Sequence, residues 1–287
     1  MKEYILLLCI LSLNACSDRL KINKEDVDKA FNKTSLPFSV LGVSIDENSP
    51  VFYSYGEANP DAIFEIASMT KAITSTAVMQ LVEQGKIDLD TPIEKYLPEI
   101  NQIEILNKDL TTQPRGNPIT MRHLLTHTSG FAYSFNSMRI MEDLGISLGD
   151  WPQPEIVAEG IYDWAFNGPQ PRQIFEAGER WHYGRNLGIA GRVIERVSGL
   201  DLDTYFKEHI FIPLGMNRSG YNLPEDIISS LLPMSLRDPL SGELMPMPSI
   251  RPVPMNSFYG GGDLLSTPRD YTRFLQCLVN GGEIDGV

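Results

Sequence analysis

The sequence has few cysteines. Only three occur in 287 residues. Cys9 and Cys16 lie close to the N-terminus, so Cys277 is the only cysteine in the rest of the chain. This count predicts a fold without an internal disulfide, in which Cys277 is a buried core residue.

The sequence also lacks an excess of positive charge. Lysine and arginine total 24 against 37 aspartate and glutamate residues, and the formal net charge is −13. No basic run offsets this balance. Because nucleic acids bind to basic surfaces, the composition argues against a nucleic acid as partner. The hydrophobic share of 42% is ordinary for a globular enzyme.

No hydrophobic run is long enough to span a bilayer, but a short one follows Lys2 and covers residues 4–13. Residues 1–15 have the pattern of an export signal. Residues 13–16, Leu-Asn-Ala-Cys, resemble a bacterial lipobox in which Cys16 is lipidated, although Asn14 is atypical there. We expect an exported protein of the bacterial cell envelope, anchored to the lipid bilayer through Cys16. A plain signal peptide is the alternative.

Ser68 and Lys71 form the only Ser-x-x-Lys pattern that stands at a predicted helix start. Residues three apart on a helix are neighbours, so the Lys71 amine can reach the Ser68 hydroxyl. The apolar neighbours of Lys71 favour a lowered pKa of its ammonium group. The pair therefore suggests a nucleophile with its own base. The alternative for an isolated match is a helix N-cap serine beside a solvated lysine.

Further blocks follow in order. They are TMRHLLTHTSGF at 120–131, AGERWHYGRNLGIAGRVIERVSG at 177–199, FIPLGMNRSGY at 211–221 and GGGDLLSTPRDYTRFL at 260–275. Together with Ser68 and Lys71 they resemble the serine beta-lactamase and penicillin-binding superfamily, in particular the class C beta-lactamase branch that includes the family VIII carboxylesterases. The resemblance extends from about residue 38 to the end of the chain.

The resemblance implies a catalytic tyrosine, and Tyr183 in WHYGRN matches its position. A tyrosine acts as a base at neutral pH only with help, which a neighbouring lysine can give. Packing against the following helix is the alternative for Tyr183, and Tyr133 in FAYSFN is a competing candidate. The resemblance also places Arg185, Asn186, Gly261 and Gly262 at the substrate.

The chain departs from the superfamily at two points. Arg185 stands two positions after Tyr183, where many beta-lactamases have asparagine, which favours carboxylic esters over beta-lactams or D-alanyl peptides as substrates. The third motif of the superfamily is missing from the sequence, so we expect an incomplete C-terminal part. A non-catalytic receptor or a decayed enzyme is a further alternative.

Hydrophobic patterning predicts strands at 38–46 and 51–55, a helix-rich stretch at about 87–213 and a hairpin turn at 238–242. The expected fold is α/β plus all-α: a beta-lactamase/transpeptidase-like antiparallel sheet flanked by helices, with an inserted helical domain. Residues 16–36 are expected to form a tether and an N-terminal helix, and residues 37–287 the hydrolase domain.

Three other motifs are set aside. Gly145-Ile146-Ser147-Leu148-Gly149 fits a nucleophile elbow but lacks the strand before it and the helix after it. His123 and His127 are four apart but have no accompanying glutamate or third ligand, so we expect no metal. The run at 260–262 lacks the lysine of a phosphate-binding loop and is expected to pack closely beside the cleft. No cofactor is expected.

Overall fold

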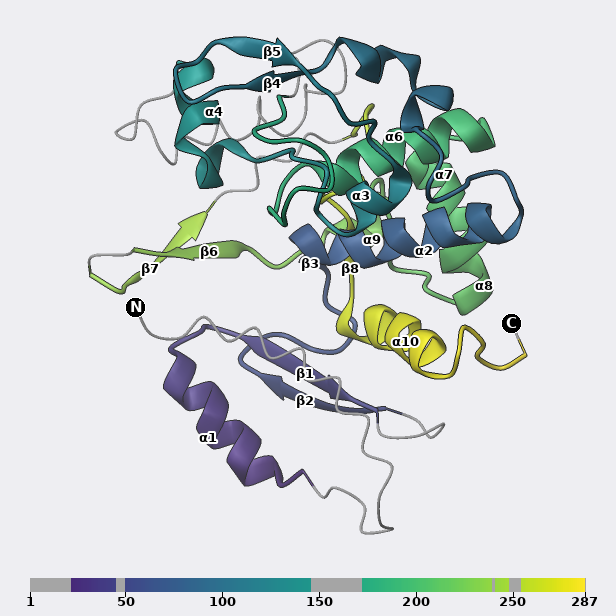
Figure 1. The fold of residues 1–287 in the computed structure, drawn as a ribbon. Coiled ribbons are helices and arrows are strands. Elements are labelled where there is room, and N and C mark those ends of the chain that lie inside the picture. The colour runs from purple at the N-terminus through teal and green to yellow at the C-terminus, as the bar shows by residue number, and fades with distance from the viewer. Residues whose placement is uncertain (1–21, 45–49, 146–171, 239–240, 248–253, 287) are drawn as a thin grey trace, which may run out of the picture.

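The computed structural model describes residues 22–44, 50–145, 172–238, 241–247 and 254–286 (Figure 1). Its α-helices are α1 (Lys24–Thr34), α2 (Thr70–Glu83), α3 (Met121–Leu125), α4 (Met138–Asp143), α6 (Asn186–Ser198), α7 (Leu202–Phe206), α8 (Ile212–Leu214), α9 (Glu225–Ile228) and α10 (Pro268–Val279). Its strands are β1 (Ser39–Val43), β2 (Val51–Tyr55), β3 (Phe64–Glu65), β4 (Glu104–Leu106), β5 (Thr112–Pro114), β6 (Met234–Arg237), β7 (Leu244–Met247) and β8 (Leu265–Ser266).

The first hairpin lies at one end of the molecule. β1 and β2 are antiparallel, with Ser39 opposite Tyr55 and Val43 opposite Val51. Helix α1 contacts β2 and α10 contacts β1, so the first and last helices of the described chain flank one hairpin (Figure 1). The two strands agree with the sequence prediction, while residues 45–49 between them lie outside the described residues.

The strands do not form the single antiparallel sheet that the sequence predicts. In the described part of the chain they form four two-stranded antiparallel sheets, β1–β2, β3–β8, β4–β5 and β6–β7. Three of these pairs are hairpins between strands that follow one another in the chain. Alternating hydrophobicity identifies a strand but not its partner, and this explains the difference. The β6–β7 hairpin flanks the turn predicted at 238–242, of which residues 239–240 are not described.

The β3–β8 pair joins distant parts of the sequence. Phe64 lies opposite Ser266, and Glu65 opposite Leu265. The Ile66 N–H adds a hydrogen bond of 3.0 Å to the Leu264 carbonyl. The segment that leads into α2 is thereby fixed to the segment that follows Gly260–Gly262.

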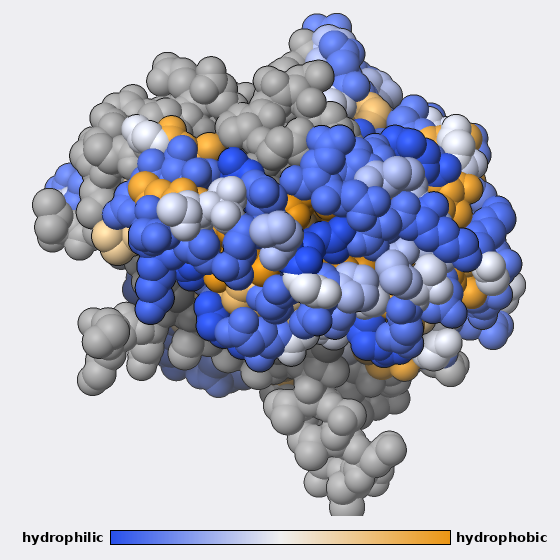
Figure 2. Space-filling view, turned by 45° about the horizontal axis from the view of Figure 1, so that its top comes forward, coloured by the Kyte–Doolittle hydropathy of each residue, from blue (hydrophilic) through white to orange (hydrophobic). Residues whose placement is uncertain are grey.

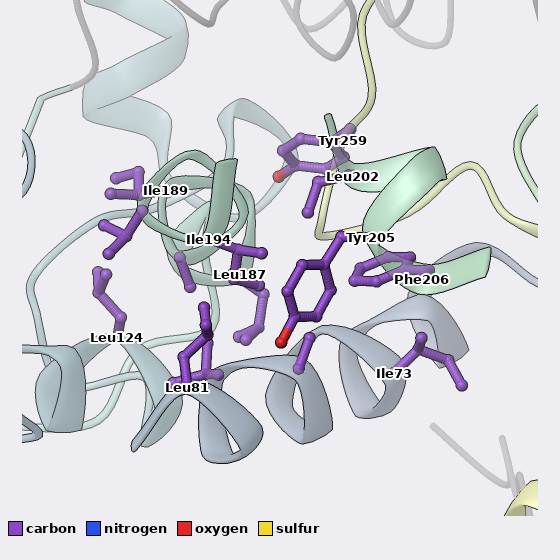
Figure 3. Close-up of a cluster of buried hydrophobic side chains, with 14 of the residues drawn as sticks. Ile73, Leu81, Leu124, Leu187, Ile189, Ile194, Leu202, Tyr205, Phe206 and Tyr259 are labelled. Carbon is purple, nitrogen blue, oxygen red and sulfur yellow. The ribbon is translucent and has the colours of Figure 1, made fainter. Parts of the chain in front are cut away.

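The main hydrophobic core lies between α2, α6 and α7 (Figure 3). Ile73 and Leu81 project from α2, Leu187 and Ile194 from α6, and Tyr205 from α7; each is at most 2% exposed. Burial of such side chains contributes about 1.5–3 kcal/mol each. The core therefore fixes the orientation of α2, the helix that begins beside Ser68.

Two helix ends follow from the residues that the sequence places there. The Thr120 hydroxyl accepts a hydrogen bond from the His123 N–H, and the His123 side chain accepts one from the Thr120 N–H, which caps the start of α3. Gly199 ends α6 with φ 76°, a left-handed conformation that glycine adopts without steric cost. Threonine before a helix and glycine after one are residues that favour these two boundaries.

The face of the molecule shown in Figure 2 is mostly polar. On the face shown in Figure 2, hydrophobic residues lie in small areas separated by hydrophilic ones. None of the helices in the described ranges combines the length and apolar character that a membrane-spanning helix needs.

Gly260 lies where two segments approach closely. A Cβ at this position would be 2.5 Å from the Leu187 carbonyl oxygen and 3.2 Å from the Gly191 Cα. Both neighbours are backbone atoms of α6, which cannot move independently of the helix. Glycine is therefore required for the contact between α6 and the 260–262 segment, as the close packing expected from the sequence implies.

We expect Gly260→Ala to destabilise the protein by about 1–3 kcal/mol, because the added methyl group forces α6 and this segment apart. Gly220→Ala is the matched control, since its Cβ would meet its nearest neighbours at an ordinary 3.4 Å. Urea unfolding of both variants measures the difference. Equal stabilities of the two variants would show that the close approach is not a constraint.

Candidate active site

Ser68 lies on a tight turn at the start of α2. Residues Ala67–Met69 form one turn of 3₁₀-helix, and α2 continues from Thr70. Ala67 has φ 42°, a left-handed conformation that is strained for alanine. The Ser68 side chain is exposed. The turn thus presents an accessible hydroxyl at the beginning of a helix.

Lys71 contacts this hydroxyl directly. Its Nζ donates hydrogen bonds to Ser68 Oγ at 3.0 Å and to the Gly261 carbonyl oxygen at 2.6 Å. The amine also lies 4.9 Å from the ring centroid of Tyr183 and 5.8 Å from that of Tyr133. Two hydrogen bonds and two aromatic rings therefore hold the amine beside the serine.

Tyr183, which is distant from Ser68 in the sequence, contacts the same hydroxyl. Its hydroxyl donates to Ser68 Oγ at 2.7 Å, across 115 positions of the chain. Asn136 Nδ2 donates to the Tyr183 carbonyl at 2.7 Å, which ties down the tyrosine's backbone. The three residues predicted to be catalytic, Ser68, Lys71 and Tyr183, are therefore in mutual contact.

The competing tyrosine is placed differently. Tyr133 is buried, and its hydroxyl lies 2.7 Å from that of Tyr259. Burial raises the pKa of the Tyr133 phenol, which keeps it protonated at neutral pH and unsuited to act as a base. Its ring packs against that of Tyr183 with centroids 5.6 Å apart. Tyr133 is part of the wall behind Tyr183.

The environment of Lys71 changes its titration. Burial lowers the pKa of the Lys71 ammonium from its ordinary value, while its hydrogen bond to the Tyr183 oxygen and the negative charge of Asp263 oppose that shift. A lowered pKa increases the fraction of neutral amine at a given pH. Lys71 is in this way better able to accept a proton than a solvated lysine.

The start of α2 is bonded repeatedly to the segment after Tyr259. Besides the bond from Lys71 to Gly261, Thr74 Oγ1 donates to the Gly260 carbonyl at 2.6 Å. The Leu264 N–H donates to Thr70 Oγ1 at 3.3 Å. Both threonines are fully buried. These contacts fix the amine of Lys71 relative to the backbone.

Two of the predicted substrate-binding side chains lie in the interior. Arg185 is 7% exposed and Asn186 is 0% exposed. The Asn186 amide accepts a hydrogen bond from Ser129 Oγ and donates one to His127 Nδ1, so its polar atoms are used inside the protein. Burial lowers the pKa of the Arg185 guanidinium. The burial of both side chains favours a role in holding the structure together over direct contact with substrate.

Gly261 and Gly262 are also buried, and their backbone atoms make hydrogen bonds within the site. The Gly261 carbonyl accepts from Lys71, and the Gly262 N–H donates to the Tyr259 carbonyl at 3.1 Å. Contact of these two glycines with substrate stays a prediction. Cys16 and Ser147 lie outside the described residues.

The two histidines do not act together. His123 caps α3, whereas the His127 ring faces Asn186 and Tyr183. Among the residues with described positions, no group of three or more His, Cys, Asp or Glu side chains could hold a metal ion.

Sequence reasoning missed several residues that build the site. Thr70, Thr74 and Tyr259 position its backbone, and Tyr271 donates from its hydroxyl to the Met69 carbonyl at 3.0 Å. Thr70 and Thr74 are four apart on α2 and share its buried face with Ile73 and Ala77. Polar residues on that face are the one signal the sequence offered. The other two contacts depend on the tertiary fold.

An exposed serine that contacts both a lysine and a tyrosine, at the start of a core helix, defines a class of serine enzymes. The chain belongs to the Beta-lactamase family, whose pattern it matches over residues 38–286. This confirms the resemblance found in the sequence and the beta-lactamase/transpeptidase-like fold.

The chain is similar to esterases and acyltransferases. It is 33% identical over 231 residues to acyltransferase calJ of Penicillium decumbens, covering 77% of this chain and 53% of that protein. It is 30% identical over 240 residues to lovastatin esterase of Penicillium rubens, covering 78% of this chain and 57% of that protein. The chain thus spans little more than half the length of these relatives.

A solved structure shows the same fold. Unliganded simvastatin synthase from Aspergillus terreus superposes with a TM-score of 0.74 at 27% identity, and the match covers 89% of this chain and 67% of that one. The described secondary structure, with mixed helices and small sheets, agrees with that assignment.

The charge of Asp263 gives a prediction for pH dependence. Asp263 favours the charged form of Lys71, so Asp263→Asn should lower the pKa of Lys71 further. If neutral Lys71 is needed for attack, the rising limb of kcat/KM against pH moves to lower pH in this variant. Asparagine tolerates the φ of 73° at this position.

A pH–rate profile with an aryl ester measures the shift. Asp109→Asn, which changes an exposed carboxylate in the β4–β5 hairpin, is the control and should leave the limb in place. A limb that moves to higher pH in Asp263→Asn would contradict the electrostatic coupling.

Proposed function

We propose that this protein is a serine hydrolase that forms an acyl-enzyme on Ser68, with carboxylic esters as its substrates. The observation that carries the proposal is the double contact of Ser68 Oγ, with Lys71 Nζ at 3.0 Å and the Tyr183 hydroxyl at 2.7 Å. A serine that attacks a carbonyl must give up its proton, and both neighbours are within reach of it.

The proposed reaction has two halves. Ser68 Oγ attacks the ester carbonyl while its proton passes to the Lys71–Tyr183 pair. The C–O bond to the alcohol then breaks, and the pair returns the proton to the departing oxygen. Water repeats the sequence on the acyl-enzyme and releases the acid. The backbone N–H of Ser68, close to the positive start of α2, is the proposed donor to the oxyanion.

Two observations favour esters over beta-lactams. Arg185 stands at the sequence position of an asparagine found in many beta-lactamases, and its side chain is buried, so that position offers no amide to a lactam. A relative that matches over 78% of this chain carries the name lovastatin esterase. Beta-lactams and D-amino-acid peptides are the alternative substrates.

Acyl transfer to an alcohol is a second candidate activity. Relatives named acyltransferase calJ, from Penicillium decumbens, and monacolin J acid methylbutanoyltransferase, from Aspergillus terreus, match 77% and 76% of this chain. The same acyl-enzyme serves both reactions, because an alcohol can replace water in the second half. Added alcohol that diverts product from the acid to a new ester would support transfer.

A non-catalytic receptor that is acylated once is the remaining alternative. It would give one stoichiometric burst without turnover. The contacts among Ser68, Lys71 and Tyr183 favour turnover instead, since a receptor has no need for proton transfer during deacylation.

We also propose export to the bacterial cell envelope and a lipid anchor at Cys16. Support comes from the sequence of residues 1–16 alone, in which a short apolar run precedes the lipobox-like cysteine.

We expect Ser68→Ala to lower the hydrolysis of p-nitrophenyl butyrate by roughly three orders of magnitude or more, because the nucleophile is lost. The fold should remain, as the side chain is exposed. Ser147→Ala is the control and should keep full activity. Loss of activity in Ser147→Ala with retention in Ser68→Ala would show that the nucleophile is Ser147, in the elbow-like motif, and would contradict the proposal.

Substrate preference is tested by comparing kcat/KM for p-nitrophenyl butyrate and a chromogenic cephalosporin, and the ester value should be the higher. A cephalosporin value equal to or above the ester value would make beta-lactamase the function.

Lys71 and Tyr183 should act as one unit. Each of Lys71→Ala and Tyr183→Phe is expected to lower kcat by about 10²–10⁴, and the double variant should be little worse than the more impaired single variant. Tyr183→Phe keeps the ring and removes only the hydroxyl. Tyr133→Phe is the control, and a collapse of kcat in that variant with a near-normal Tyr183→Phe would transfer the role to Tyr133.

The anchor predicts a change of location. Cys16→Ser, expressed in a bacterial host, should release the protein from the membrane fraction, because one acyl-bearing residue has been removed. Labelling with a radioactive fatty acid should mark the unaltered protein and not the variant. If the unaltered protein takes up no label and the variant stays with the membrane as the unaltered protein does, Cys16 is not lipidated. A plain signal peptide or another attachment would then explain the location.

A further inference from the structure

His127 binds the backbone on both sides of Tyr183. Its carbonyl oxygen accepts a hydrogen bond of 2.8 Å from the His182 N–H, and its Nδ1 accepts one of 3.4 Å from the Gly184 N–H. His127 reaches both because its own backbone has φ 56°, an uncommon left-handed conformation for a residue other than glycine. The residues before and after Tyr183 are thus attached to one histidine.

The imidazole ring also contacts Tyr183 itself. The two ring centroids are 4.8 Å apart, with an angle of 35° between the planes. On the edge facing α6, Asn186 Nδ2 lies 2.8 Å from His127 Nδ1, and Ser129 Oγ donates to the Asn186 oxygen. An amide nitrogen can only donate, so His127 Nδ1 accepts and the ring hydrogen is on Nε2.

The charge state of His127 agrees with this hydrogen-bond pattern. Burial, followed by the charges of Lys71 and His182, lowers its pKa to about 4. The imidazole is therefore neutral at neutral pH, and Nδ1 has a lone pair for its two donors. A charged ring would lose that acceptor and would add a second positive charge beside Lys71.

We propose that His127 is a positioning residue that holds the Tyr183 hydroxyl on Ser68 Oγ. This rests on the proposed function and extends it by a residue that does not touch the reacting atoms. Three contacts carry it: the bond to the N–H before Tyr183, the bond to the N–H after it, and the ring against its phenol. Gly184 completes the clamp, since a Cβ there would lie 2.0 Å from the Phe131 carbonyl oxygen.

The test is a double-mutant cycle in the full chain, with p-nitrophenyl butyrate as substrate. His127→Phe keeps an aromatic ring and removes the acceptor nitrogen. In the parent protein it should lower kcat by about 10- to 100-fold, as expected for a catalytic group displaced by about 1 Å, with KM little changed. In the Tyr183→Phe background the same change should cost less than about 3-fold, because the hydroxyl to be positioned is absent.

His123→Phe is the matched control. His123 lies four residues earlier, caps α3 and has no ring contact with Tyr183, so its replacement should lower kcat by a similar small factor in both backgrounds. If His127→Phe does not fold, His127→Gly runs the same cycle, since glycine also removes the acceptor nitrogen and adopts the positive φ without strain. An equal loss of kcat from the His127 change in both backgrounds overturns the proposal and leaves His127 a purely structural residue.

A crystal structure of His127→Phe gives a readout that does not depend on activity. The distance from Tyr183 to Ser68 Oγ, 2.7 Å in the parent, should exceed 3.5 Å. An unchanged distance overturns the proposal. The Ser68→Ala assay separates the two hypotheses, because an active Ser68→Ala variant refutes the proposed function while leaving this distance as a test of positioning.

Discussion

The site depends on the attachment of the first turns of α2 to the segment at 260–264. Thr74 donates to the Gly260 carbonyl, Lys71 donates to the Gly261 carbonyl, and Leu264 donates to Thr70. The residues that these bonds join are 186 to 194 positions apart in the sequence. They require Gly260, because any side chain there would collide with the backbone of α6. Without this attachment the amine of Lys71 would lose one of its two hydrogen bonds and the direction that points it at Ser68.

The chemistry follows from this rigid placement. Burial destabilises the ammonium form of Lys71, while the phenol of Tyr183 and the carboxylate of Asp263 favour it. In the proposed reaction the Ser68 proton is therefore shared between Lys71 and Tyr183, both of which already contact Ser68 Oγ. Preorganised groups of this kind need little rearrangement when charge develops, which is the usual source of electrostatic catalysis. The strained backbone at Ala67 directly precedes Ser68, and that at His127 lies in the segment that binds the backbone on both sides of Tyr183.

The sequence predicts the local part of the site and little of its tertiary part. Ser68 and Lys71 lie three apart on one helix, so helical geometry alone brings them together. Tyr183 is 115 positions from Ser68, and only the resemblance to the superfamily indicated it. Arg185 and Asn186 were predicted at the substrate from the same resemblance, and the structure shows that both side chains are buried where α6 begins. Strand positions at 39–43 and 51–55 could be predicted, whereas the pairing of β3 with β8 depends on contacts that no periodicity encodes.

The central claim is that Ser68 carries the acyl group, and mass spectrometry of the trapped intermediate tests it most directly. The protein is mixed with p-nitrophenyl butyrate, quenched in acid during turnover and digested. The account predicts one butyryl group on the peptide that contains Ser68, and a longer-lived adduct in Tyr183→Phe, in which deacylation lacks part of its proton transfer. A butyryl group on any other residue, or hydrolysis without an adduct on Ser68 in either protein, would contradict it.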